Sequence, residues 1–267
     1  LKTDNVSTWF CQRLTNNETH ILTEREIAKL RAEEMSEDMI QQEWYCSFTL
    51  GIQGSYYAKY LAECRDDQRI CSVPHDRHGR VYTSWDLGLD CTAIVFFQYV
   101  GQEVHVIDYY ENKDEEISHY AKIIKDKPYI YDEHYAPSDS AKRSMDDKKS
   151  TRMLYSELGI DYTVLPTIDI SLDTGVEYTR ALFPRIWFDE VKCTPLIRAL
   201  ENYRREWDDE HKIYKSKPVH DRWSHGSDAF RYMAIATRIR QRSTTGINDE
   251  QDEDYKTRYQ PIFGKGI

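Results

Sequence analysis

Hydrophobic residues follow strand-like patterns through the middle of the chain and helical patterns before and after it. A continuous apolar run at residues 91–99 predicts a buried strand. Gly101 and Gln102 follow this run and predict a hairpin to the next strand. The strands are expected at residues 81–86, 91–99, 103–110, 128–131 and 162–165.

Helices are expected between and after these strands. The one at residues 150–158 precedes Gly159, a residue that commonly ends helices. The order of strands and helices predicts an α/β fold, in which a central mixed sheet of five or more strands is flanked by helices. The expected helices are residues 114–125, 150–158, 173–183, 194–206 and 224–242.

The two ends of the chain differ from this middle part. Residues 23–42 have a charged, helical pattern, and Thr23 with Glu26 predicts a capping box at its start. Residues 243–267 are polar and acidic, so a flexible tail is expected there. We therefore expect three segments: residues 1–75, a main domain at 76–242, and the tail.

Composition narrows the class of protein. The 267 residues are 40% hydrophobic and 31% charged, as in globular proteins. No apolar run approaches the roughly 18 residues of a membrane span, and no signal peptide is expected at the polar N-terminus. The six cysteines form no C-x-x-C pair, which favours reduced thiols in a cytosolic protein. The net charge of -10 argues against a broad basic face for nucleic acid.

Three acidic motifs carry the candidate chemistry. In Ser84-Trp85-Asp86-Leu87-Gly88 an aspartate ends a strand, where a buried carboxylate is costly unless a cation meets it. Asp132 and Asp139 follow the fourth expected strand, and His225-Gly226-Ser227-Asp228 opens the last helix. Each motif also has an ordinary explanation: a turn, a polar loop, and an acid favoured by the helix dipole.

Taken together, the motifs are more specific than any one of them. Acids after the first strand, after the fourth strand and on a late helix are the arrangement of RNase H-like nucleases. Two-metal hydrolysis of a phosphodiester needs carboxylates that hold hard cations about 3.5–4 Å apart. We therefore expect two Mg²⁺ or Mn²⁺ ions, with Asp86 as the bridging ligand.

The sequence also resembles a known family, the C-terminal nuclease domain of the large terminase subunit of tailed phages, which is a genome-packaging motor protein. The most specific match begins at His220 and runs through Asp228 to Ala229. The matching motifs are Gln42-Glu43-Trp44-Tyr45-Cys46-Ser47-Phe48, Ser84-Trp85-Asp86-Leu87-Gly88, Tyr135-Ala136-Pro137-Ser138-Asp139, Thr174-Gly175-Val176-Glu177 with Arg180, Trp187-Phe188-Asp189, and His220-Asp221-Arg222-Trp223-Ser224-His225-Gly226-Ser227-Asp228-Ala229.

The resemblance implies Asp86, Asp139 and Asp228 as metal ligands. His225 lies one turn before Asp228 and is expected to orient water or phosphate. One departure is Ser138, because relatives often have histidine before the second aspartate. Secondary candidates for the site are Asp132, Asp90 and Asp189. Candidate DNA contacts are Lys142, Arg143, Lys148, Lys149 and Arg152.

The same resemblance implies a substrate and partners. Concatemeric double-stranded DNA would be cut to start and end packaging in the host cell cytoplasm, away from any membrane. An upstream ATPase motor domain, a small terminase subunit and the portal of the procapsid would be partners. These residues contain no G-x-x-x-x-G-K-[ST] phosphate loop. Residues 1–75 therefore resemble the end of the motor domain and its linker, and no ATP hydrolysis is expected.

Three alternatives stay open at this point. One is another RNase H-like enzyme, such as a junction resolvase, an integrase or a ribonuclease H. A second is a non-catalytic DNA-binding module with structural acids, although carboxylates that are brought together without a cation repel one another. A third is a zinc protein that uses Cys193, His220 and His225.

Overall fold

The computed structural model describes residues 14–32, 40, 44–45, 54–88, 90–141, 149–208, 210–211 and 213–245. The chain divides into two compact units, Leu1–Gln53 and Gly54–Ile267. Within the first unit, the described residues include helices α1 (Asn16–Thr19) and α2 (Glu24–Ala32). The predicted capping box is present at α2, because the Thr23 backbone N–H donates to Glu26 Oε2 at 2.8 Å and the Glu26 backbone N–H donates to Thr23 Oγ1 at 3.4 Å.

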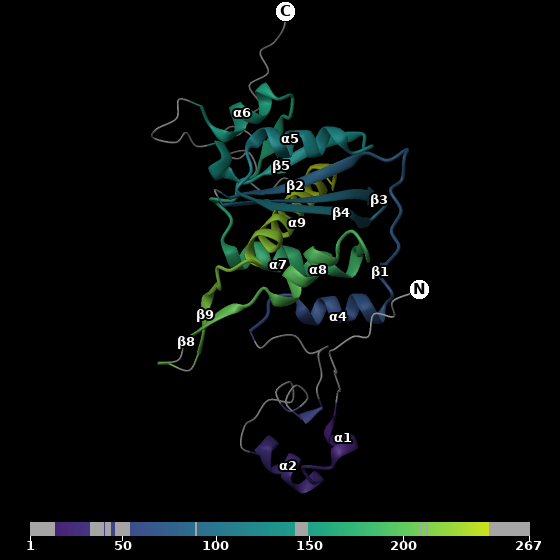
Figure 1. The fold of residues 1–267 in the computed structure, drawn as a ribbon, viewed down its shortest axis with the longest axis vertical. Helices are drawn as coiled ribbons and strands as arrows, with labels where there is room; N and C mark the ends of the chain where they lie inside the picture. Colours follow the sequence, from purple (N-terminus) through teal and green to yellow (C-terminus); the bar gives the residue numbers. More distant parts are fainter. Residues whose placement is uncertain are drawn as a thin grey trace, which may run out of the picture. The chain divides into compact units, whose positions relative to one another are not determined.

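A seven-stranded mixed sheet is the centre of the second unit, in the order β1-β7-β4-β3-β2-β5-β6 (Figure 1). The β2–β3 and β3–β4 pairs are antiparallel, and the other neighbours are parallel. With its flanking helices, this sheet confirms the expected fold class. The strands are β1 (Ile70–Cys71), β2 (Val81–Leu87), β3 (Cys91–Val100), β4 (Glu103–Lys113), β5 (Tyr131–Ala136), β6 (Tyr162–Val164) and β7 (Ile186–Asp189).

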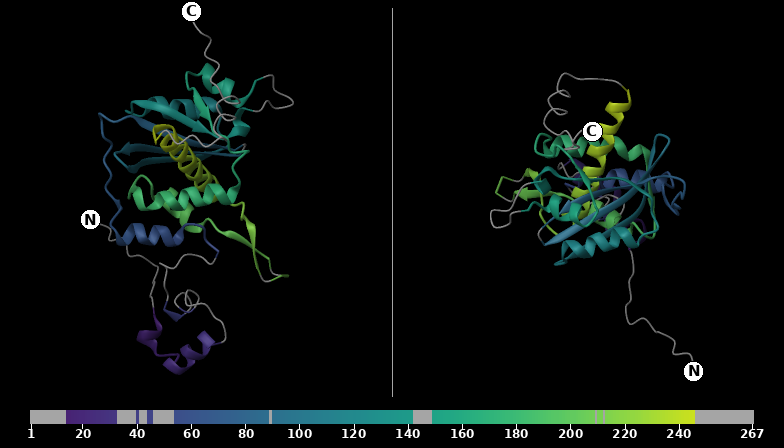
Figure 2. Two further views of the ribbon diagram at one scale, coloured as in Figure 1. Left: turned by 180° about the vertical axis from the view of Figure 1, so that it is seen from behind. Right: turned by 90° about the horizontal axis from the view of Figure 1, so that it is seen from above.

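Helices cover both faces of the sheet (Figures 1 and 2). One face packs against α4 (Ala58–Asp66), α7 (Leu172–Leu182), α8 (Thr194–Asn202) and α9 (Ser224–Thr245). The other face packs against α5 (Ile117–Asp126) and α6 (Thr151–Glu157). Successive residues of β3 point to opposite faces, so Ile94 and Phe96 belong to one core and Val95 and Phe97 to the other. This two-sided burial explains the continuous apolar run.

The fourth expected strand is displaced in the structure. It was expected at residues 128–131, but β5 is Tyr131–Ala136, so Asp132 and Glu133 begin a strand instead of following one. Their side chains are exposed, whereas the end of β5 is buried from His134 on. Charged residues at the exposed start of a strand resemble a loop in sequence, which is why the prediction was wrong.

Smaller differences concern the ends of elements. The helix expected at residues 194–206 ends at Asn202, and the chain continues into a two-stranded ribbon of β8 (Arg205–Asp208) and β9 (Ile213–Pro218). Short 3₁₀ turns follow β5 and α7, at η1 (Ser138–Ala141) and η2 (Phe183–Arg185). No helix within the described ranges is long and apolar enough to cross a membrane.

The second unit includes residues that precede the expected boundary at residue 76. Helix α4 packs on α8, and β1 pairs with β7 through Ile70 opposite Phe188. At the other end, α9 extends to Thr245, and the rest of the expected tail lies outside the described residues. The division of the chain into residues 1–75, 76–242 and 243–267 stays a prediction.

Candidate active site

Asp86 lies near the carboxyl end of β2, on the face of the sheet that α9 covers. In register it stands opposite Ala93 of β3, which in turn stands opposite Glu111 of β4, so these three residues share one face. A Cβ on Gly88 would lie 2.5 Å from the carbonyl oxygen of Cys91. Glycine therefore permits the close approach by which the chain turns from β2 into β3, directly after Asp86.

The first turns of α9 are hydrogen-bonded to β2 and lie close to β4. The Ser84 hydroxyl donates to the backbone carbonyl of Ala229. A Cβ on Gly226 would lie 2.5 Å from the Tyr109 hydroxyl oxygen, so glycine is what allows α9 to approach β4 this closely. The two contacts place the side chains of the His225–Asp228 motif beside the end of β2.

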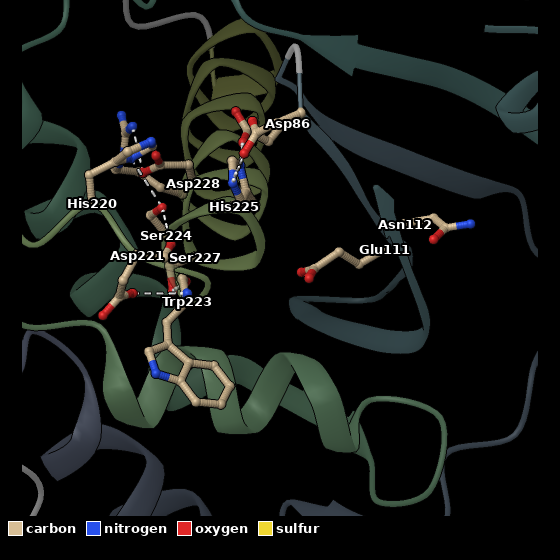
Figure 3. A network of polar contacts seen from close by, with 12 residues as sticks. Asp86, Glu111, Asn112, His220, Asp221, Trp223, Ser224, His225, Ser227 and Asp228 are labelled. Carbon is tan, nitrogen blue, oxygen red and sulfur yellow. Dashed lines mark hydrogen bonds and ion pairs between the residues drawn. The ribbon is translucent and has the colours of Figure 1, made fainter. Parts of the chain in front are cut away.

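His225 contacts Asp86 directly (Figure 3). Its Nδ1 lies 3.1 Å from Asp86 Oδ2, and its Nε2 lies 3.8 Å from Oδ2 of the exposed Asp90. The side chains of His225 and Asp86 are only 8% and 16% exposed, so this contact is made largely away from water. Low solvent access strengthens a charge-assisted hydrogen bond and orients the Asp86 carboxylate.

Burial dominates the electrostatics of Asp86. It raises the pKa of the carboxyl group to about 6, the hydrogen bond from His225 opposes this shift, and the negative charge of Asp228 adds to it. Conversely, the hydrogen bond to Asp86 raises the pKa of His225, against the effect of burial. A cation near Asp86 would favour its ionised form, because an opposite charge lowers the pKa of an acid.

Asp228 is hydrogen-bonded to two side chains within the fold. Its Oδ1 accepts a hydrogen bond from Arg231 Nη2 at 3.0 Å and from the Tyr203 hydroxyl at 3.1 Å. A Cβ on Gly175 of α7 would lie 3.0 Å from Arg231 Cδ, so this glycine leaves room for the arginine stem. Asp228 was expected from its motif, whereas Arg231 and Tyr203 were not.

Asp139 lies in η1, directly after β5. Thr167 Oγ1 accepts the Ser138 backbone N–H at 2.9 Å and so holds this turn. Tyr232 of α9 is a buried residue next to Arg231. Burial is the main cause of the raised pKa of its hydroxyl, and the charges of Asp86, Asp228 and Asp139 raise it further.

The acids are gathered without forming a preassembled chelating cluster. No group of three or more His, Cys, Asp or Glu side chains in the described part of the chain is placed to hold a metal ion. Asp86 and Asp228 are each held by a neighbouring side chain, His225 and Arg231 respectively. The structure therefore brings Asp86 and Asp228 to the first turn of α9, each bonded to a basic group, whereas Asp139 lies in η1 after β5.

Asp132 lies at the other end of the sheet. It is the second residue of β5, and it accepts a hydrogen bond from the Tyr82 hydroxyl. Strands β2 and β5 are parallel, with Val81 opposite Tyr131, so Asp132 is level with the start of β2. Asp86 lies near the end of the same strand. The structure does not bring Asp132 and Asp86 together.

Asp189 forms hydrogen bonds within the loops around β7. Its carboxylate accepts backbone N–H groups from Val73 at 3.2 Å, Val191 at 3.1 Å and Lys192 at 2.8 Å. These contacts hold the turn between β7 and α8 and join it to the segment after β1. The structure thus gives Asp189 a role in loop geometry, and only Asp90 of the secondary candidates lies beside His225.

The other candidate residues are spread over the unit. Lys142, Arg143 and Lys148 lie outside the described residues. Lys149 pairs with Glu157 at 2.5 Å, on the surface beside α6. The thiol of Cys193, one of the candidate zinc ligands, is buried against the Val106 carbonyl oxygen at 3.4 Å, whereas His220 lies 5.7 Å from His225 between ring centroids.

Sequence reasoning missed Glu111, which lies near the same site. Its side chain points toward the first turn of α9, whereas Asn112 points away (Figure 3). It accepts a hydrogen bond from Tyr109, and its negative charge contributes to the raised pKa of His225. The cross-strand register that aligns Glu111 with Asp86 was the signal needed to find it.

The seven-stranded mixed sheet with helices on both faces is an α/β fold of the RNase H-like kind. No protein-family model matches the sequence, and no curated protein matches it. The large terminase of a thermophilic bacteriophage has a similar structure, with a TM-score of 0.53 and 18% identity over 83% of this chain and 53% of that chain. The nuclease domain of the P22 large terminase aligns with a TM-score of 0.50 and 17% identity over 64% of this chain and 89% of that chain.

These likenesses establish the fold. The chain has the fold of the large-terminase nuclease domains, and it spans about half the length of the thermophilic-phage terminase.

Proposed function

We propose that this chain carries the endonuclease of a viral DNA-packaging terminase. Its substrate would be concatemeric double-stranded DNA, which it cuts to start and to end the packaging of a genome. The observation that carries the proposal is the contact of the buried Asp86 carboxylate with His225, one turn before Asp228 on α9, in a fold shared with large-terminase nuclease domains. A mostly buried carboxylate with a second acid on the neighbouring helix is costly to a fold unless it serves chemistry.

We further propose that Asp86, Asp139 and Asp228 bind two Mg²⁺ or Mn²⁺ ions. Carboxylate oxygens are the hard donors that such ions prefer. Asp86 is bonded through Oδ2 and Asp228 through Oδ1, and no hydrogen bond among the described residues reaches the second oxygen of either carboxylate. One oxygen of each thus stays free for a cation. Bound ions would stabilise negative charge on the phosphate and activate water.

The residues around the aspartates would orient them. With Asp86 ionised, the Nδ1–H group of His225 would donate a hydrogen bond to Asp86 Oδ2 and so fix the direction of the carboxylate. The same contact places Nε2 on the side of the exposed Asp90. Glu111 adds a further carboxylate on the same sheet face and is a secondary candidate beside Asp90.

A cleavage assay with matched variants tests the proposal. The protein should nick and cut duplex DNA with Mg²⁺ or Mn²⁺ and be inert in a chelator. Asp86→Asn, which preserves shape and removes the charge, should abolish cutting, whereas Asp132→Asn at the other end of the sheet should preserve it. Cleavage that persists in excess chelator, or an active Asp86→Asn protein, would refute the mechanism.

The choice of substrate separates the terminase from related enzymes. Linear duplex DNA should be cut at least as well as a four-way junction or an RNA–DNA hybrid. A strong preference for the junction would instead identify a resolvase, and a preference for the hybrid a ribonuclease H.

We propose that the chain acts in the host cell cytoplasm. Its partners there would be an upstream ATPase motor domain, a small terminase subunit and the procapsid portal.

A further inference from the structure

The negative charge of Asp228 is balanced inside the fold by Arg231, one turn later on α9. Arg231 Nη2 lies 3.0 Å from Asp228 Oδ1, and the two side chains are 10% and 23% exposed. The Tyr203 hydroxyl donates to the same oxygen at 3.1 Å. Both donors therefore hold the carboxylate by one oxygen and leave Oδ2 without a hydrogen bond from the described residues.

Arg231 is incompletely satisfied for a buried arginine. The guanidinium group has five N–H donors, yet Arg231 Nε is buried and without a hydrogen-bond partner in the described ranges. The group also lies over the ring of Tyr232, at 4.8 Å from the centroid. A partly satisfied buried ion pair generally stabilises a fold less than well-packed apolar residues of the same size.

Gly175 shows how closely α7 packs against this arginine. A Cβ at position 175 would lie 3.0 Å from Arg231 Cδ and 3.2 Å from Cγ, so α7 touches the arginine stem. This packing holds the guanidinium group beside the Asp228 carboxylate. A positively charged side chain, Arg231, is therefore held against Asp228, whose neighbour Asp86 is also an acid.

We propose that Arg231 is a positioning residue for the divalent cations: it holds Asp228 by Oδ1, leaves Oδ2 for a metal ion, and lowers the negative charge that the ion meets. This inference rests on the proposed function. Arg231 then makes metal binding weaker than the three aspartates alone would make it, and at the same time fixes the direction of Asp228. Removing its charge should strengthen metal binding and impair turnover, two effects that a purely structural residue would not combine.

Calorimetric titration with Mn²⁺ measures the effect on metal binding, and cleavage at saturating Mn²⁺ measures the effect on turnover. Arg231→Met, which keeps most of the stem, should bind Mn²⁺ about tenfold more tightly, because a positive charge in contact with a ligand has been removed. Its turnover should fall at least about tenfold, because Asp228 is no longer held. Arg231→Lys, which keeps the charge, should bind Mn²⁺ within about twofold of the unaltered protein.

A matched control removes the positively charged side chain that pairs with another buried aspartate, Asp108. Lys127 pairs with Asp108 at 2.5 Å beside α5, on the opposite face of the sheet, so Lys127→Met should leave Mn²⁺ affinity unchanged. If Arg231→Met does not fold, Arg231→Gln gives the same test, because glutamine retains an N–H donor but no charge. Unchanged or weaker Mn²⁺ binding by a folded neutral variant overturns the inference and leaves the proposed function standing. An unaltered protein that neither binds Mn²⁺ nor cuts DNA overturns the proposed function itself.

Discussion

Replacing Asp86 by asparagine should stabilise the metal-free protein at neutral and alkaline pH. Folding raises the pKa of Asp86 from 3.8 to about 6, which corresponds to about 3 kcal/mol between its two protonation states. Because the folded state binds this proton more tightly than the unfolded state does, stability falls as the pH rises from about 4 to about 6. Below that window the penalty is absent, and above it the whole penalty is present.

Asparagine keeps the shape of Asp86 and an acceptor for His225 but carries no charge. At pH 8 in a chelator, the free energy of unfolding of Asp86→Asn should therefore exceed that of the unaltered protein by up to about 3 kcal/mol. At pH 4 the difference should largely vanish. This difference of about 3 kcal/mol already includes the opposing effect of the hydrogen bond from His225, which lowers the pKa of Asp86.

Urea denaturation across this pH range, with and without Mn²⁺, measures the effect. Mn²⁺ should stabilise the unaltered protein at pH 8 and have little effect on Asp86→Asn. The control is Asp132→Asn, an exposed aspartate at the start of β5, which should retain the pH dependence and the response to Mn²⁺. If Asp86→Asn and the unaltered protein have the same pH dependence between 4 and 6, Asp86 is not the buried charge inferred here.

Three other outcomes are expected. Gly226→Ala should lower the melting temperature and the cutting rate, because its Cβ would lie 2.5 Å from the Tyr109 hydroxyl oxygen, and the added change Tyr109→Phe should restore part of both; no rescue would contradict the contact. Asp139→Ala should lose metal-dependent cutting while Asp132→Ala keeps most of it, and the reverse result in the same assay would exchange their roles. DNA binding, measured against salt on the inactive Asp86→Asn protein, should be weak and have a shallow salt dependence, because a chain with a net charge of -10 neutralises few phosphates; nanomolar affinity at physiological salt would refute this.

The sheet was predictable where burial left a clear pattern. The apolar run of β3 indicated a strand that is covered on both faces, and its residues do divide between two cores. The turn at Gly101 and Gln102 indicated the hairpin, and Gly101 has the positive φ of 61° that such a turn favours. Local chemistry determined these features, so the sequence was sufficient for them.

The neighbourhood of Asp86 was less predictable, because it depends on register. Strands β3 and β4 change register between Phe96 and Phe97. Without this irregularity, the pairing that starts at Val100 opposite Glu103 would place Glu111 on the other face of the sheet. No residue pattern marked this change, and so Glu111 was not expected beside Asp86.

The partner of Asp228 was missed for a different reason. Arg231 follows three residues later on the same helix, a spacing at which opposite charges commonly meet. On an exposed helix such a pair carries little information, because surface ion pairs are frequent and weak. Only the packing of α7 and β2 against α9 shows that this pair is buried and adjacent to the other acids.

Helix α9 runs without interruption from Ser224 to Thr245. It has 22 residues, so its length is about 33 Å. Asp228 lies near one end, and near the other Arg240 lies over the rings of Tyr82 and Tyr99, at 5.0 and 4.9 Å from their centroids. Pivoting the helix by only ~5° about Arg240 would displace Asp228 by ~1.6 Å relative to Asp86, given the rise of an α-helix. A shift of that size exceeds half the length of a hydrogen bond, so contacts at the far end of α9 help to set the distance between the two carboxylates.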